Sequence, residues 1–99
     1  MTVNIHALHF DADSKLLEHV NKKISKLSSH HDKILKVDVY LKLDNVMHQI
    51  KDKIAEIRVK IPKRELFVKQ TTKSFEESFD MAVDAVLVQI KRVKEKQFA

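Results

Sequence analysis

The hydrophobic positions at the start of the chain change from a period of two to a period of three or four. Between residues 2 and 7, every second residue is apolar, which predicts a short strand with one buried face. Asp11 and Asp13 then supply acidic N-terminal signals for a helix that ends near Ser28. The predicted apolar stripe of this helix consists of Leu16, Leu17, Val20, Ile24 and Leu27.

The middle of the chain returns to a period of two. The odd positions from Leu35 to Leu43 are apolar and alternate with polar residues, which predicts a long strand with one solvated face. We expect a polar connection at Asn45–Asp52 and a third strand at Ala55–Ile61. Pro62-Lys63-Arg64 predicts a tight turn. The inward positions of the strand that follows are Leu66 and Val68.

The last quarter of the chain, Ser74 to Lys96, predicts one long amphipathic helix. Ser74 and Glu77 have the spacing of a capping box, in which each side chain satisfies an amide group of the first turn. The helix begins acidic and ends basic, and this order complements the helix dipole. Its predicted apolar stripe consists of Phe75, Phe79, Ala82, Val83, Val86, Ile90 and Val93.

These elements predict an α+β fold of one domain, residues 1–99, in the order β-α-β-β-β-α. A right-handed crossover makes the first two strands parallel, and the hairpins that follow add antiparallel neighbours. Only one face of each strand is apolar, so both helices should cover the same face of a mixed four-stranded sheet.

Composition excludes several classes of protein. The 99 residues contain no glycine, which phosphate-binding loops of nucleotide folds require, and no cysteine for disulfides or thiolate sites. No segment has the length and hydrophobicity of a membrane span or signal peptide, so we expect a cytoplasmic protein without a membrane partner. The net charge of +5 favours an acidic partner.

Basic residues gather on both predicted helices. Lys15, Lys22, Lys23 and Lys26, with His19 among them, share an arc of the first helix. The last helix ends with four further cations, which are also explained by the helix dipole alone. If the helices lie side by side, the two faces form one basic patch suited to a phosphate backbone. The four cations of the last helix are Lys91, Arg92, Lys94 and Lys96.

Other candidate sites have alternative explanations. Tyr40 and Phe67 on the outward strand face are compatible with base stacking or with ordinary cross-strand pairing. His30, His31 and His48 match no common zinc spacing, so we expect no metal or other cofactor, His31 packed where an aromatic would be, and His48 in a solvated loop. The one dense carboxylate cluster is explained by its place at a helix start, so we expect no enzyme. It consists of Glu76, Glu77, Asp80 and Asp84.

Several short segments carry a family resemblance by their residues and their spacing. They are Val3-Asn4-Ile5, Lys23, Lys26-Leu27, Asp32-Lys33-Ile34, Leu41-Lys42, Phe79-Asp80, Asp84, Gln89-Ile90 and Lys94. Together they cover nearly the whole chain, which resembles the ribosome hibernation promoting factors, also called ribosome-associated translation inhibitors, in their short form.

This resemblance implies a fold similar to a double-stranded RNA-binding domain that docks in the neck of the small ribosomal subunit. Basic residues of both helices would contact ribosomal RNA there and cover ground used by messenger and transfer RNA, so that translation stops. The protein would be a monomer with no small-molecule substrate. The residues that match basic positions of the family are Lys23, Lys26, Lys91, Arg92 and Lys94. Helix geometry adds Lys15, Lys22 and Lys96 to the expected RNA-binding residues.

The chain departs from the family pattern at several positions. Pro62-Lys63-Arg64 stands where the family often has glycines, so a more cationic turn is expected. Ala85 and Val88 replace polar or basic residues and thin the patch, and two histidines replace aromatics before Asp32. The chain ends at Ala99, so the C-terminal dimerisation domain of the long form is not expected.

Three functions remain open from the sequence. The first is an RNA-binding inhibitor of idle ribosomes that acts by steric occlusion, and the second is a general double-stranded RNA-binding module. The third is a regulatory protein that binds another protein through the exposed Met81 and Val88 and the solvated sheet face. Steep salt dependence is expected of the first two and not of the third.

Overall fold

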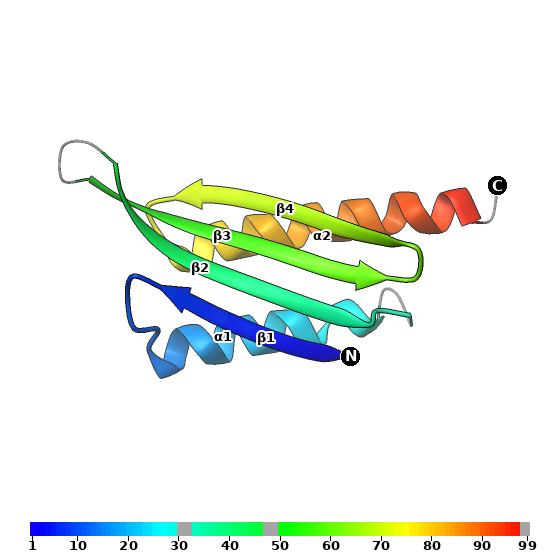
Figure 1. The fold of residues 1–99 in the computed structure, drawn as a ribbon, viewed down its shortest axis with the longest axis horizontal. Helices are drawn as coiled ribbons and strands as arrows, with labels where there is room; N and C mark the ends of the chain where they lie inside the picture. The colour runs from blue at the N-terminus through cyan, green and yellow to red at the C-terminus, as the bar shows by residue number, and fades with distance from the viewer. Residues whose placement is uncertain (30–32, 47–49, 98–99) are drawn as a thin grey trace.

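The computed structural model describes residues 1–29, 33–46 and 50–97, and it contains the predicted elements in the predicted order (Figure 1). A short 3₁₀ helix, η1, is added after the first helix. The elements are β1 (Thr2–Leu8), α1 (Ser14–Ser25), η1 (Leu27–Ser29), β2 (Lys36–Val46), β3 (Ile50–Ile61), β4 (Arg64–Thr72) and α2 (Phe75–Gln97).

The four strands form one mixed sheet in the order β1-β2-β3-β4. β1 pairs with β2 in parallel, and the two remaining pairs are antiparallel. β1 and β4 therefore run in the same direction, and each is followed by a helix that turns back, so α1 and α2 run parallel to each other on the same face of the sheet (Figure 1). The predicted α+β architecture is confirmed.

The hydrophobic core lies between the sheet and the two helices. The register places Ile5, Val39, Ile57 and Val68 in one row across the four strands, and such rows face the helices. Both predicted helical stripes are buried, except that Leu17 is only half-buried. Because the apolar residues occupy one side of each helix, no helix in the described part of the chain is apolar enough along its length to cross a membrane.

The two helices begin at polar caps. The Asp13 carboxylate accepts a hydrogen bond from the Leu16 N–H at 2.8 Å, as expected of an N-cap. Ser74 Oγ accepts from the Glu77 N–H at 3.3 Å, which is one half of the predicted capping box. The other half is absent, because the Ser74 N–H donates to Thr72 Oγ1 at 3.1 Å instead of to Glu77.

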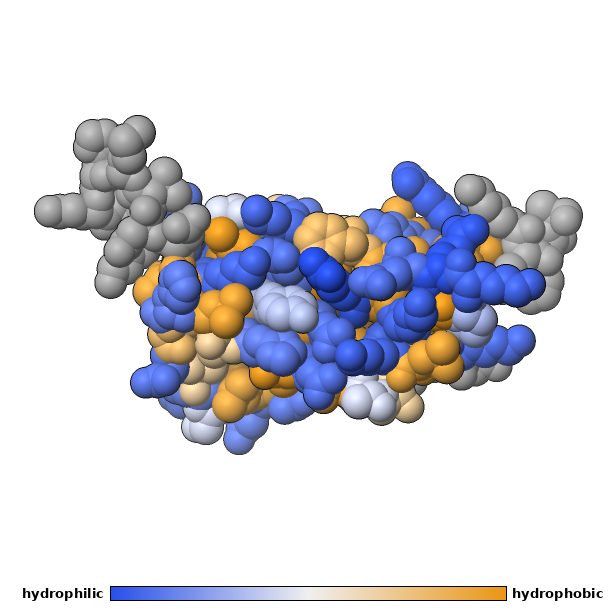
Figure 2. Space-filling model, viewed as in Figure 1, coloured by the Kyte–Doolittle hydropathy of each residue, from blue (hydrophilic) through white to orange (hydrophobic). Residues whose placement is uncertain are grey.

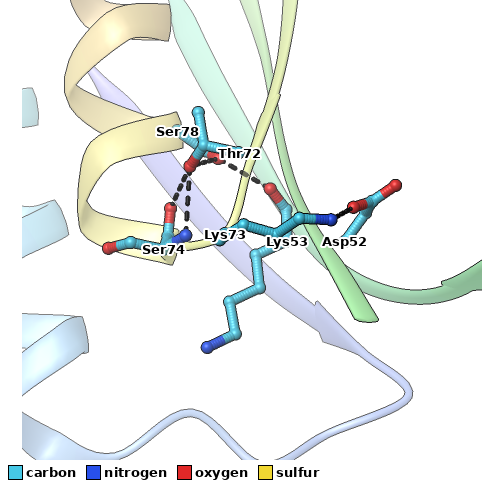
Figure 3. Close-up of polar contacts among 6 residues, drawn as sticks. All are labelled: Asp52, Lys53, Thr72, Lys73, Ser74 and Ser78. Carbon is cyan, nitrogen blue, oxygen red and sulfur yellow. Dashed lines mark hydrogen bonds and ion pairs between the residues drawn. The ribbon is translucent and has the colours of Figure 1, made fainter. Parts of the chain in front are cut away.

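A buried hydroxyl network fixes the start of α2 against the end of the sheet (Figure 3). Ser78 is fully buried, and its Oγ donates to the Lys53 carbonyl of β3 at 2.6 Å. Thr72 Oγ1 of β4 lies 2.7 Å from Ser78 Oγ and 2.7 Å from the Ser74 carbonyl oxygen. Beside this network, Lys73 and Asp52 form an ion pair. The first turn of α2 is thereby tied to two strands at once.

The predicted connection at Asn45–Asp52 is wrong, because β2 continues to Val46 and β3 begins at Ile50. The pairing of β1 with β2 ends at Lys42 of β2, and the pairing of β4 with β3 ends at Lys53 of β3. Beyond those residues the hairpin pairs only with itself and extends past both neighbouring strands. Polar residues are therefore tolerated in the strands there.

Two apolar side chains expected to be buried are exposed. Leu35 is 53% exposed because it precedes β2 at the end of the sheet, and the preceding Ile34 is buried instead. Ala7 is exposed near the end of β1, which is an edge strand. Inward orientation in a strand ensures burial only where a helix covers that position.

The turn between β3 and β4 contains only Pro62 and Lys63, because Ile61 pairs directly with Arg64. Proline fixes its own φ near −65°, and Lys63 has a φ of 71°. These signs match a type II turn, whose third position favours glycine. The predicted tight, cationic turn is confirmed.

Candidate nucleic-acid interface

One side of α1 carries a stripe of basic residues. Lys15, His19, Lys22 and Lys26 follow at intervals of four, three and four residues, which places them on one helix face, and Lys23 lies beside them. Lys15, Lys22 and Lys26 are exposed, and Lys23 is partly exposed. The predicted arc is therefore accessible to a ligand.

An ion-pair cluster joins this stripe to α2. His19 Nε2 lies 2.7 Å from Asp80 Oδ1, and Lys23 Nζ lies 3.8 Å from the same oxygen. The His19 ring also meets the buried Phe79 edge to face, with ring centroids 6.1 Å apart. These contacts fix the rotation of both helices, so the α1 stripe borders the side of α2 that carries Asp80.

The same side of α2 carries two of the predicted cations. Asp80, Leu87 and Lys94 are spaced by seven residues and so lie on one line along the helix. Lys91 and Lys94 border a groove of about 360 Å³, which Leu87, Val88 and Ile90 also line. We call it the α2 groove. Its lysines lie on the flank of α2 that faces α1, near the C-terminal end of α2.

Arg92 does not belong to that surface. It follows Lys91 by 100° and precedes Lys94 by 200° around the helix, so it lies on the other flank of α2. There it lines a groove with Arg64 of β4. Lys96 lies in the last turns of α2, still within the helix. The structure thus places Lys91 and Lys94 on the flank of α2 that faces α1, and Arg92 on the opposite flank.

Most of these cations have no carboxylate partner in the part of the chain that the structure describes. Within the described residues, no carboxylate oxygen lies within 4.0 Å of the side-chain nitrogens of six predicted cations, and Lys23 alone shares Asp80. An unpaired cation keeps its full charge for an external anion, whereas a paired one is partly neutralised. The six are Lys15, Lys22, Lys26, Lys91, Arg92 and Lys94.

The sheet face away from the helices, here called the open face, has a different charge pattern. Figure 2 shows this face, which is mainly hydrophilic with scattered apolar side chains. Asp38 lies 3.5 Å from Lys36 and 4.0 Å from His6, and Lys42 lies 2.5 Å from the buried Glu56. Lys36 and Lys42 of the open face therefore have carboxylate partners, whereas Lys60 and Lys69 of the same face have none within 4.0 Å among the described residues.

The aromatic residues of the open face form a stack across the strands. His6 stacks on Tyr40 with ring centroids 4.7 Å apart and planes within 14°. The Arg58 guanidinium lies 5.8 Å from the Tyr40 ring and 5.3 Å from the Phe67 ring. His6 and Arg58 thus contact the Tyr40 ring, which favours the cross-strand interpretation over a base-stacking platform.

Two further sequence predictions concern histidines and apolar residues. In the ranges that the structure describes, no three His, Asp or Glu side chains are grouped as metal ligands. His30, His31 and His48 lie outside those ranges, so their expected placements stay predictions. Met81 and Val88 are 43% and 50% exposed, as the protein-interaction hypothesis requires.

Sequence reasoning missed two features of this region. The contact of His19 with Asp80 joins residues 61 positions apart, and Arg64 meets Arg92 only through the packing of α2 on β4. The amphipathic pattern indicates which side of a helix is buried, but not which exposed flank faces which neighbour. Neither feature had a signal in the sequence.

Comparisons with known proteins identify the family and agree with this fold. The family model described as Sigma 54 modulation protein / S30EA ribosomal protein matches residues 3–97. A ribosome hibernation promoting factor of Pseudomonas putida is 29% identical over 97 residues, which cover 98% of this chain and 90% of that protein. The resemblance inferred from the sequence is therefore confirmed.

Two solved structures share the fold. The N-terminal domain of Thermus thermophilus Protein Y is 26% identical, with a TM-score of 0.81 over 94% of this chain and 99% of that one. A ribosomal subunit interface protein from Coxiella burnetii has a TM-score of 0.83 over 96% of this chain and 99% of that one. Its identity is 17%, so it supports the fold alone.

Proposed function

Because the chain belongs to the Sigma 54 modulation protein / S30EA ribosomal protein family, we propose that it is a ribosome hibernation factor that binds the small ribosomal subunit. It occupies ground near the decoding sites that messenger and transfer RNA also need, and it inhibits translation by this occlusion. The hibernation promoting factor among its relatives supports this proposal.

The observation that carries the proposal is the set of unpaired cations on the helices. Lys22, Lys26, Lys91 and Lys94 have no carboxylate within 4.0 Å among the described residues, whereas Lys36 and Lys42 of the open face are paired. Cations that neutralise phosphates release condensed counterions, and this release drives binding. The helical side is therefore the surface on which ribosomal RNA binds.

The packing of the aromatic residues on the open face bears on the mode of recognition. His6 and Arg58 contact the Tyr40 ring, so a nucleobase cannot stack there without displacing them. Lysines on rigid helices contact phosphates, which fix position on RNA without reading sequence. Specificity for the subunit then comes from the shape of the folded ribosomal RNA.

Sedimentation with purified small subunits tests this proposal. Salt between 50 and 200 mM is expected to lower the affinity by about 10³-fold if all six unpaired cations contact phosphates. Lys91→Gln with Lys94→Gln should weaken binding and flatten the salt dependence. Lys60→Gln with Lys69→Gln removes the same charge from exposed positions of β3 and β4 and serves as the matched control.

The Asp80→Asn variant adds an opposite result. It removes the carboxylate that lies 3.8 Å from Lys23, so this lysine becomes available to phosphate and affinity should rise. Occlusion is tested by filling the decoding sites with messenger and transfer RNA, which should prevent binding of the protein. Equal loss of affinity in the helical variant and in its matched control would contradict the proposal, and so would binding that is insensitive to salt.

A further inference from the structure

The C-terminal half of α2 carries cations on two opposite flanks. Lys94 and Arg92 are two residues apart and so point about 200° apart around the helix. Lys94 borders the α2 groove on the flank that carries Asp80. Arg92 lies on the flank next to β4. One helix therefore presents positive charge to two separate spaces.

The space beside β4 is a groove of about 190 Å³ with an arginine from each side. Arg64 comes from the first position of β4, directly after the two-residue turn, and Arg92 comes from α2. Gln89 also lines the groove and donates from Nε2 to the Phe67 carbonyl at 3.4 Å, which joins the helix to the edge strand. Both arginines are thus placed by regular elements.

Both guanidinium groups are available to a ligand. Arg64 and Arg92 are exposed, and no carboxylate oxygen of the described residues lies within 4.0 Å of either one. Arg58 on the open face differs, because its guanidinium lies over two aromatic rings. No aromatic ring of the described residues lies under the guanidinium of Arg64 or Arg92 in this way.

The chemistry of the groove favours an anion over an apolar ligand. Leu66 and Val93 also line it, but they are only 7% and 6% exposed and offer little apolar surface. Guanidinium groups bind phosphate through two parallel hydrogen bonds, which lysine cannot reproduce. Two arginines that line the same groove therefore suit phosphodiester oxygens.

We propose that Arg64 and Arg92 form a second RNA-backbone site, separate from the lysines of α1 and from Lys91 and Lys94 of α2. This inference rests on the proposed binding to ribosomal RNA and adds a second RNA strand that the protein contacts. An α-helix with its side chains is about 10–12 Å wide. The C-terminal half of α2 lies between two RNA backbones, with Lys91 and Lys94 on one and both arginines on the other.

Salt titration of binding to small subunits separates the two sites. Affinity falls as salt rises, and each lost phosphate contact makes the plot of log affinity against log salt less steep by about 0.7–0.9. The double variant Arg64→Gln with Arg92→Gln should therefore reduce the steepness of this plot by about 1.4–1.8. The double variant Lys91→Gln with Lys94→Gln should reduce it by a similar amount. The combined variant should show the sum. The Lys60→Gln and Lys69→Gln double variant should keep the wild-type slope.

Backbone footprinting of the ribosomal RNA locates the contacts. The arginine variant should lose one set of protected riboses and the lysine variant a different set. The arginine variant could keep the wild-type salt dependence and protected riboses while the lysine variant loses both. That result would overturn the second site and leave the proposed function intact. Reduced affinity with unchanged RNA protection would assign the groove to a protein carboxylate and also overturn it. Absence of wild-type binding would overturn both proposals.

Discussion

Replacement of Ser78 by alanine is expected to destabilise the protein through the network that holds the start of α2 (Figure 3). Ser78 is fully buried, and its hydroxyl bridges Lys53 of β3 and Thr72 of β4 at 2.6 and 2.7 Å. Alanine removes both contacts without changing the backbone of the helix. The Lys53 carbonyl then loses this donor in a part-buried position.

The magnitude follows from two opposing contributions. Loss of a buried partner costs about 1–3 kcal/mol, because the remaining polar group stays desolvated. Alanine returns about 0.5 kcal/mol through its higher helix propensity. The free energy of unfolding should therefore fall by about 1.5 kcal/mol, which lowers the melting temperature by about 6–12 °C for a domain of this size.

Thermal unfolding followed by circular dichroism measures this change. Ser25→Ala is the matched control, because Ser25 is exposed in α1 and its hydroxyl donates to the nearby Lys22 carbonyl at 2.8 Å. This control should melt within about 2 °C of the wild type. If Ser78→Ala melts no lower than Ser25→Ala, the buried network does not contribute to stability and the reasoning is wrong.

Two further predictions concern the turn and the open face. Lys63→Gly should raise the free energy of unfolding by about 0.5 kcal/mol, because the φ of 71° costs lysine more than glycine loses in entropy, and Lys63→Ala should not; equal melting temperatures for both variants would refute this. Phe67→Ala should change the affinity for small subunits less than twofold, since Phe67 packs with Arg58 in the cross-strand stack. If Phe67 stacks on a base, filter binding would instead show a loss of about 1–3 kcal/mol, or roughly 5–150-fold.

The fold was predictable where one face of an element is buried. The stripes of both helices and the alternation in β2, β3 and β4 reflect a single buried face, so periodicity located them. The hairpin beyond Lys42 and Lys53 was not predictable, because it extends past both neighbouring strands and the apolar alternation of the sequence ends at Leu43. Ser74 and Glu77 had the spacing of a capping box, but Thr72 supplied a closer acceptor.

The candidate interface was predictable as two basic helix faces, but not as an arrangement in space. Spacing of about 100° per residue already places Arg92 and Lys94 on different flanks. Which flank faces α1 depends on the rotation of α2, which the contact between His19 and Asp80 fixes. Arg64 and Arg92 line one groove only because α2 packs on β4, and no local sequence pattern encodes this arrangement.

The order of charges along α2 also influences how the protein approaches a polyanion. The helix has 23 residues and runs about 34 Å in a molecule whose longest extent is 49 Å. Glu76 and Glu77 lie at its start, whereas Lys91 and Lys94 lie near its end. The field of an RNA therefore exerts a torque that turns the C-terminal end of α2 toward the backbone before contact. Orientation during diffusion raises the association rate at low ionic strength, while the dissociation rate is set by the contacts made afterwards.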